Sequence, residues 1–210
     1  MNIAVAIDEA SKKASPDAGD AGPAAKRVVV AYGFWIFLLS DVVMFSALFA
    51  CYAVLVRATA DGPTGDELFN QFSVAIETVC LLASSYTCGL MSLAVNSRRR
   101  VAIYFFAAIT FVLGAAFLDL EIHEFAAMIA RGATPQSSAF LSAFFTLVGC
   151  HGLHVTAGLV WLVVMMAQVA IKGFRPNVGR RLLCFALFWH TLDIVWVWLF
   201  TVVYLMGVRP

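Results

Sequence analysis

Three pairs of ionisable residues lie inside long apolar stretches of the sequence, where a charged side chain is costly. The members of each pair are three residues apart: Glu121 and Glu124, His151 and His154, and His190 and Asp193. Residues three apart share one face of a helix, so each pair can act as a unit. Histidines and carboxylates on facing helices can bind a metal or a haem. They can also neutralise one another in a buried polar network.

The small number of histidines favours the buried network over a metal or haem site. The chain has only four histidines, far fewer than a membrane di-iron hydroxylase is expected to need. A bis-histidine haem needs two imidazoles that face each other, which His151 and His154 on one helix cannot supply alone, although His190 could be a partner. Two further acids, Asp41 and Glu77, also lie in apolar stretches.

We therefore predict no catalytic, cofactor-binding or metal-binding residue in this chain. No phosphate-binding loop, nucleophile elbow or flavin fingerprint is present in the sequence. We expect the ionisable residues to form a buried polar network or to contact lipid. We also expect the two pairs on spans four and five, His151 with His154 and His190 with Asp193, to join these spans to each other or to join this chain to a partner. The residues concerned are Asp41, Glu77, Glu121, Glu124, His151, His154, His190 and Asp193.

Composition places these residues in a membrane protein. The 210 residues are 62% hydrophobic and 13% charged, with a mean hydropathy of +0.88, whereas soluble domains are about half apolar and about a quarter charged. A net charge of +1 gives no indication of a nucleic-acid partner. The apolar runs do not alternate, which excludes a membrane β-barrel. The fold class we predict is an all-α bundle of five transmembrane helices.

Five stretches are long enough to cross a bilayer, which needs about 20 apolar residues in helical form. Residues 1–30 are rich in Ala, Asp, Lys, Gly and Pro, and we expect a disordered cytoplasmic tail there. The transmembrane domain is expected at 31–208. Its spans are expected at about 31–56, 72–95, 101–128, 139–171 and 182–206. Turn-forming residues separate the spans at 61–65, 132–138 and 173–179.

The distribution of positive charge predicts the orientation of the chain. Cytoplasmic loops of membrane proteins carry an excess of Lys and Arg. One side holds eleven of the 14 such residues, in the tail and in the loops after spans two and four. The other side holds only Arg57, Arg131 and Arg209. We expect a cytoplasmic N-terminus and a periplasmic C-terminus, in the inner membrane of a bacterium.

Two motifs then indicate a family. Residues 144–155 (FFTLVGCHGLHV) resemble the HGLHV motif of subunit III of the haem–copper oxidases, and residues 188–196 (FWHTLDIVW) resemble its WHxxDxVW motif. Residues 37–41 (FLLSD) resemble its first retained helix, with Asp41 where cytochrome c oxidases usually have glutamate. Glu121 and Glu124 fall where the family carries a Glu-x-x-Glu pair. The resemblance covers about residues 30–207.

The number of spans and three shorter segments indicate which branch of the family the chain resembles. Subunit III of cytochrome c oxidases usually has seven helices, and this chain lacks the first two. Residues 52–56 (YAVLV), 62–65 (GPTG) and 200–207 (FTVVYLMG) are similar to subunit III of bacterial cytochrome o ubiquinol oxidase. This implies an accessory subunit of a complex that oxidises ubiquinol, reduces oxygen to water and pumps protons.

The resemblance also implies partners. The haems and copper would belong to subunit I, which would be the main contact, with subunits II and IV and membrane lipids beside it. Three alternatives remain open: subunit III of a cytochrome c or menaquinol oxidase, a stand-alone haem- or metal-binding membrane protein, and a small proton-coupled transporter.

Overall fold

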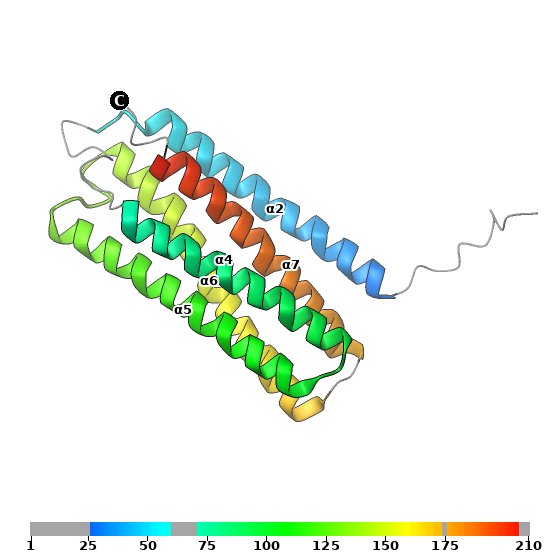
Figure 1. Ribbon diagram of the computed structural model, residues 1–210. Coiled ribbons are helices and arrows are strands. Elements are labelled where there is room, and N and C mark those ends of the chain that lie inside the picture. The colour runs from blue at the N-terminus through cyan, green and yellow to red at the C-terminus, as the bar shows by residue number, and fades with distance from the viewer. Residues whose placement is uncertain (1–25, 60–70, 174–175, 206–210) are drawn as a thin grey trace, which may run out of the picture.

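The computed structural model describes residues 26–59, 71–173 and 176–205, and every regular element in these ranges is helical. The helices are α2 (Lys26–Leu55), α4 (Gln71–Asn96), α5 (Arg100–Ala130), α6 (Ala139–Lys172) and α7 (Pro176–Leu199), and α7 continues into a short π-helical segment, η1 (Phe200–Leu205). They run up and down as one elongated bundle (Figure 1). Five helices of this part of the chain are long and apolar enough to cross a membrane, which confirms the predicted fold class.

Two helices begin earlier than their apolar runs suggested. The first helix was expected from residue 31 and begins at Lys26, and the last was expected from residue 182 and begins at Pro176. Proline is well tolerated in the first helical turn because its missing N–H needs no partner there. Residues 176–181 include two arginines and therefore do not belong to an apolar span, although they are helical. The predicted turn at 61–65 and most of the predicted tail lie outside the described residues.

The turn between α5 and α6 ends one helix and starts the next by local hydrogen bonds. Gly132 has φ of 82°, and the N–H groups of Gly132 and Ala133 donate to the carbonyl oxygens of Ile129 (3.0 Å) and Met128 (3.0 Å). This is a Schellman ending, which favours glycine because of the positive φ. The Ser138 hydroxyl then accepts from the Leu141 N–H (3.1 Å) and caps the start of α6. The sequence predicted this break correctly.

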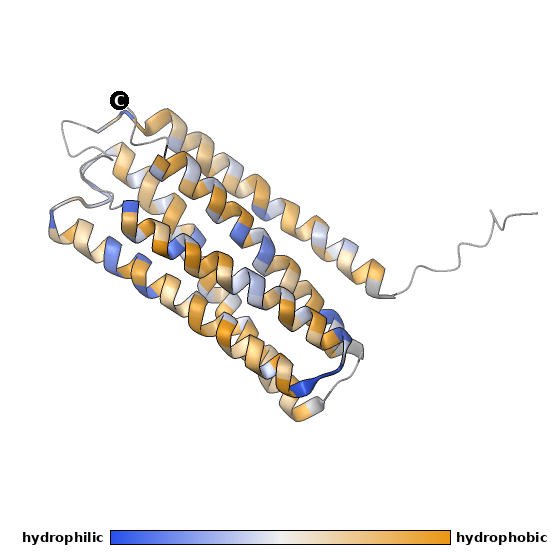
Figure 2. Ribbon diagram, viewed as in Figure 1, coloured by the Kyte–Doolittle hydropathy of each residue, from blue (hydrophilic) through white to orange (hydrophobic). Residues whose placement is uncertain are grey.

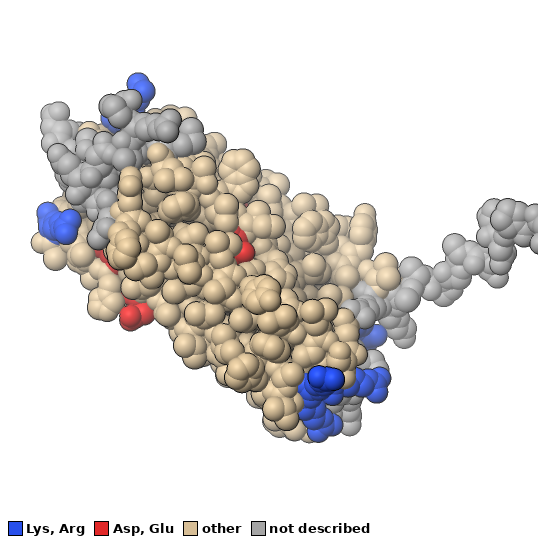
Figure 3. Space-filling view, in the orientation of Figure 1, with Lys and Arg blue, Asp and Glu red and all other residues tan. Residues whose placement is uncertain are grey.

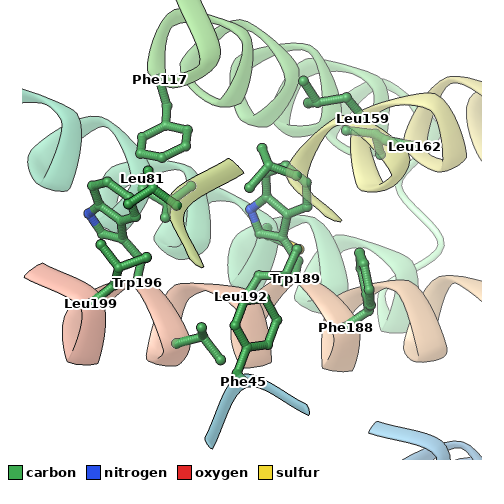
Figure 4. Close-up of a cluster of buried hydrophobic side chains, with 14 of the residues drawn as sticks. Phe45, Leu81, Phe117, Leu159, Leu162, Phe188, Trp189, Leu192, Trp196 and Leu199 are labelled. Atoms are coloured by element: carbon green, nitrogen blue, oxygen red, sulfur yellow. The ribbon is translucent and has the colours of Figure 1, made fainter. Parts of the chain in front are cut away.

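Helix α7 lies at the centre of the bundle and packs against α2, α4 and α6. Its two buried tryptophans, Trp189 and Trp196, point to the same side of α7, whereas Phe45 of α2 approaches α7 from another side (Figure 4). The Trp189 indole fits only because it faces glycines on α5 and α6. A Cβ placed on Gly114 would lie 3.0 Å from Trp189 Cζ2, and one placed on Gly158 would lie 2.7 Å from Trp189 Cζ3.

Candidate functional site: buried polar side chains

Helices α4 and α7 are joined by a seam of hydrogen bonds at the middle of the bundle. Both buried indoles donate to hydroxyls of α4, and a histidine pairs with a third hydroxyl. The bonds are Trp196 Nε1 to Thr78 Oγ1 (3.1 Å), Trp189 Nε1 to Ser84 Oγ (3.1 Å) and Ser85 Oγ with His190 Nδ1 (2.8 Å). Polar groups that are paired across helices cost little in an apolar medium, so α4 provides the partners that the polar groups of α7 need.

Ser85 connects the two members of the pair on α7. Its hydroxyl is hydrogen-bonded to His190 and also interacts with the Asp193 carboxyl. A hydroxyl donates one hydrogen and can accept another, so one serine can serve both groups. Asp193 Oδ1 is nevertheless buried and has no hydrogen-bond partner within the described ranges. The pair that we expected to join span five to span four therefore contacts α4 instead.

His151 of α6 lies in an aromatic environment rather than in a polar network. Its ring centroid lies 5.1 Å from that of Trp196, 5.8 Å from that of Phe117 and 6.3 Å from that of Phe45. The side chain is fully buried, and neither ring nitrogen has a hydrogen-bond partner in the described part of the chain. Its surroundings are those of a packed core residue.

His154 of α6 and Asp41 of α2 lie where these two helices face each other. His154 Nδ1 donates to the carbonyl oxygen of Cys150 one turn earlier (2.7 Å), and its ring lies 5.3 Å from that of Phe45. Asp41 is half-buried and is close enough to the Cys150 thiol for an electrostatic interaction. Neither histidine of α6 is hydrogen-bonded to His190 or Asp193 in the ranges that the structure covers.

The structure brings three predicted carboxyl residues together: Glu77 of α4 with Glu121 and Glu124 of α5. They are near enough to interact electrostatically. Glu77 is 0% exposed, and neither of its carboxyl oxygens has a hydrogen-bond partner among the described residues. Glu121 Oε2 and Glu124 Oε1 are also buried without a partner. The Tyr204 hydroxyl of η1 donates to Glu124 Oε2 at 3.5 Å, so this carboxyl cluster (Glu77, Glu121 and Glu124) is only partly satisfied.

Helix α6 leaves room for the carboxyl cluster. A Cβ on Gly152 would lie only 2.7 Å from Glu121 Oε1, so glycine at this position lets the carboxyl lie against the helix backbone. A cavity of about 250 Å³ adjoins the cluster between α4 and α5. Glu77 and Glu124 line it, together with Ser73, His123 and Arg131 near the helix ends.

Sequence reasoning found the ionisable residues but missed the hydroxyl groups that serve them. Trp189 and Trp196 are seven residues apart on α7, which puts both indoles on one helix face and was a detectable signal. Their partners Ser84 and Thr78 are six residues apart on α4, a spacing that does not stand out in the sequence. Tyr204 carries no such signal, because its contact with Glu124 depends on the π-helical end of α7.

Within residues 26–59, 71–173 and 176–205, no group of three or more His, Cys, Asp or Glu side chains is arranged to hold a metal ion. The exposed pair of His123 and Asp119 is separated by 3.8 Å. We therefore assign no metal ligand in this part of the chain.

The two ends of the bundle differ in charge. Hydrophobic residues cover the length of the helices, and hydrophilic residues concentrate near the ends and at the middle of the bundle (Figure 2). Basic side chains gather at the end formed by the α4–α5 turn and the start of α7, which we call the basic end (Figure 3). Its described members are Arg98, Arg99, Arg100, Arg180 and Arg181. The opposite end has Arg57 and Arg131 and lies nearer the carboxyl cluster.

These features define a multi-pass membrane protein. Aromatic packing and interhelical hydrogen bonds stabilise its interior, which also contains polar groups without a partner in the described part of the chain. A sequence profile described as cytochrome c oxidase subunit III matches residues 16–208. The chain belongs to this family and is an accessory subunit of a haem–copper oxidase.

Several curated relatives are subunits of quinol oxidases. The chain is 51% identical over 176 residues to cytochrome bo(3) ubiquinol oxidase subunit 3 of Pseudomonas aeruginosa, covering 84% of each chain. It is 49% identical to the protein of the same name from Pseudomonas putida, covering 84% of this chain and 85% of that one. It is also 44% identical to quinol oxidase subunit 3 of Bacillus spizizenii, covering 83% of this chain and 86% of that one.

Proposed function

We propose that this chain is the non-catalytic subunit III of a bacterial terminal oxidase that oxidises ubiquinol, reduces oxygen to water and pumps protons. The observation that carries the proposal is the 51% identity, over 84% of both chains, to a protein named as subunit 3 of a ubiquinol oxidase. The absence of a metal-binding cluster from the described residues is compatible with an accessory role. The haems and the copper would then reside in subunit I.

Subunit I is the main partner in this proposal, and subunits II and IV belong to the same complex. The half-buried Asp193 on α7 gives a physical reason for a protein partner. Part of this carboxyl group faces outward from the bundle, where a bilayer would make it costly, and a polar group from a neighbouring transmembrane helix would reduce that cost. Interhelical hydrogen bonds of this kind contribute about 1 kcal/mol each.

The chain would lie in the inner membrane with its basic end in the cytoplasm. Five described arginines at that end against two at the other are in line with the positive-inside rule. In this orientation the carboxyl cluster lies nearer the periplasm. The N-terminus is cytoplasmic and the C-terminus is periplasmic.

A groove near the basic end would suit a structural lipid. It has a volume of about 380 Å³ and runs between α2, α6 and α7, where it is lined by apolar side chains and by Arg180 and Arg181. Basic residues near the cytoplasmic side attract anionic lipid headgroups. We therefore include bound phospholipid among the partners of the chain.

Affinity purification of the tagged chain in mild detergent tests this proposal. We expect haem- and copper-containing subunit I to co-purify in equal amount, together with oxygen uptake that depends on ubiquinol. Loss of the chain should leave quinol oxidation per haem near that of the intact complex. Recovery of a complex that prefers cytochrome c or menaquinol would assign the chain to another branch of the family, and recovery of the chain alone with bound haem would refute the proposal.

A further inference from the structure

The carboxyl cluster combines three observations that the accessory role does not explain. Glu77 and Glu121 are almost fully buried, at 0% and 3% exposed. Among the residues that the structure describes, four of the six carboxyl oxygens of the cluster are buried without a hydrogen-bond partner. A cavity that reaches residues at the helix ends is lined by two of the three glutamates. A purely structural core would be expected to pair these groups or to replace them with apolar ones.

The two buried carboxyl groups and the half-buried Glu124 cannot all be negatively charged without a compensating positive charge. Moving even one carboxylate into a medium of low dielectric constant is strongly unfavourable, and like charges that are close together add to the cost. The nearby fixed cations do not remove this cost. Arg131 and His123 lie at the exposed rim of the cavity, and His123 is paired with Asp119.

The compensating charge can therefore be a proton or a metal ion. A metal ion needs several ligands in a fixed arrangement, and the described residues contain no group that provides one. A proton needs only one carboxyl oxygen and a path for exchange. The cavity of about 250 Å³ has room for several water molecules, each of which takes about 30 Å³ in the liquid.

We propose that Glu77, Glu121 and Glu124 form a proton-holding cluster that exchanges protons through a water-filled cavity with the aqueous phase at the end of the bundle opposite the basic end. In each exchange a hydronium ion transfers a proton to a carboxylate oxygen, giving a carboxylic acid and water, and the reverse step releases the proton. The cavity brings water to Glu77 and Glu124, and Glu121 lies deeper against Gly152.

The groups that face the cluster come from α4, α5, α6 and η1. Helix α4 contributes Glu77, and α5 contributes the other two glutamates. Segment η1 contributes the Tyr204 hydroxyl, which is bonded to Glu124. Helix α6 presents Gly152 to the cluster, and its His151 faces aromatic rings.

Infrared spectroscopy of the purified oxidase complex tests the proposal directly. The stretching band of protonated carboxyl groups should decrease as the pH is raised and should shift in heavy water. Glu77→Gln, Glu121→Gln and Glu124→Gln each keep the shape and hydrogen-bonding ability of a protonated carboxyl, so we expect the complex to assemble and part of the band to be lost. Asp119→Asn is the matched control, because Asp119 is an exposed acid on α5 and its loss should leave the band unchanged.

Three results would overturn the proposal. They are a band in the wild type that responds neither to pH nor to heavy water, a band that survives in all three glutamine variants, and a metal ion that is retained stoichiometrically by the wild type and lost in Glu77→Gln. If a variant fails to assemble, the wild type provides a second test. A hydrophobic carbodiimide modifies protonated carboxyl groups, and mass spectrometry identifies the glutamates that react. Adducts on Glu77 or Glu124 that disappear at high pH support the cluster, and their absence contradicts it. Co-purification with subunit I is measured separately and bears only on the proposed function.

Discussion

At the scale of single residues, the position of a buried side chain is fixed by the shape of its neighbours and by its hydrogen bonds. The Trp189 indole occupies the space between Gly114 and Gly158, and its N–H is bonded to Ser84. Such a group is fixed both by shape and by a hydrogen bond. Substitutions around it should therefore be less tolerated than substitutions at apolar positions that face lipid.

The first prediction concerns Gly158. We expect Gly158→Ala to destabilise the assembled subunit by about 1–3 kcal/mol, because the added methyl would overlap the Trp189 ring and the core is closely packed. Gly89→Ala is the control, since a Cβ at that position would meet no described atom within 4 Å beyond the adjoining residues and backbone of its own helix. Thermal unfolding in detergent measures both, and equal stability of the two variants would show that Trp189 can move aside.

The second prediction concerns Ser85. We expect Ser85→Ala to destabilise the packing of α4 against α7 by about 1–3 kcal/mol, because it leaves His190 and Asp193 without their shared partner. Ser92→Ala is the control, since the hydrogen bond that the structure shows for Ser92 runs to the Cys88 carbonyl oxygen of its own helix. A double-mutant cycle of Ser85→Ala with His190→Ala should give a coupling free energy clearly different from zero. Additive effects would contradict the hydrogen bond.

The sequence was sufficient to identify the ionisable residues of the site but not their partners. A charged residue in an apolar run is conspicuous, and Glu77, Glu121 and Glu124 were all found in this way. Whether His190 turns toward α6 or α4 depends on the rotation of α7 about its axis. That rotation is determined by packing, above all by the fit of Trp189 against two glycines, and cannot be derived from spacing within one helix.

At the scale of elements, the turn between α4 and α5 is a short connection whose residues all lie in the described part of the chain. These helices are separated by only three residues, and the N–H groups of Ser97, Arg98 and Arg99 donate to carbonyl oxygens at the end of α4. Arg98 has φ of 52°, a left-handed conformation. The turn therefore places a strained backbone and a positive charge at the same residue.

The third prediction separates these two roles of Arg98. We expect Arg98→Asn to leave stability nearly unchanged, since asparagine tolerates a positive φ, whereas Arg98→Val should cost about 1–2 kcal/mol. Both changes remove the same charge, so their difference reports the backbone alone. Thermal unfolding of the two variants provides the measurement, and similar midpoints would mean that the turn relaxes to another conformation.

The sequence predicted the elements better than their ends. All five helices were found from apolar length, because a helix in a bilayer must satisfy its own backbone hydrogen bonds. Their extensions at Lys26 and Pro176 and the π-helical end at Phe200–Leu205 were not found. Each extension contains two basic residues, which interrupt the apolar run, and a change from α- to π-helical hydrogen bonding has no effect on hydropathy.

At the scale of the whole molecule, the charged residues are distributed unequally between the two ends of the bundle. The basic end is separated by the apolar length of the helices from the end that carries the carboxyl cluster. In a membrane with a negative interior potential, such a distribution favours one orientation over the other.

The fourth prediction is the topology of the chain in the membrane. A reporter enzyme fused after Pro210 should be active in the periplasm, and one inserted in the turn at residues 97–99 should remain cytoplasmic. The expectation rests on the excess of positive charge at the basic end. Replacing Arg98, Arg99 and Arg100 together with uncharged residues should weaken this preference, and a cytoplasmic signal from the C-terminal fusion would contradict the assignment.

Helix α2 contacts the rest of the bundle along a narrow strip, where Leu38, Phe45 and Tyr52 are buried at intervals of seven residues. Its main neighbours are α6 and α7, which the ribosome makes last. Roughly 80 residues lie between the end of α2 and the start of α6, and at about 5–20 residues per second their synthesis takes on the order of 4–16 s. During this interval the nascent α2 lies in the bilayer or beside an insertion factor. Its mid-membrane Asp41 is not yet covered by α6. Quality control during biogenesis would therefore act first on this helix.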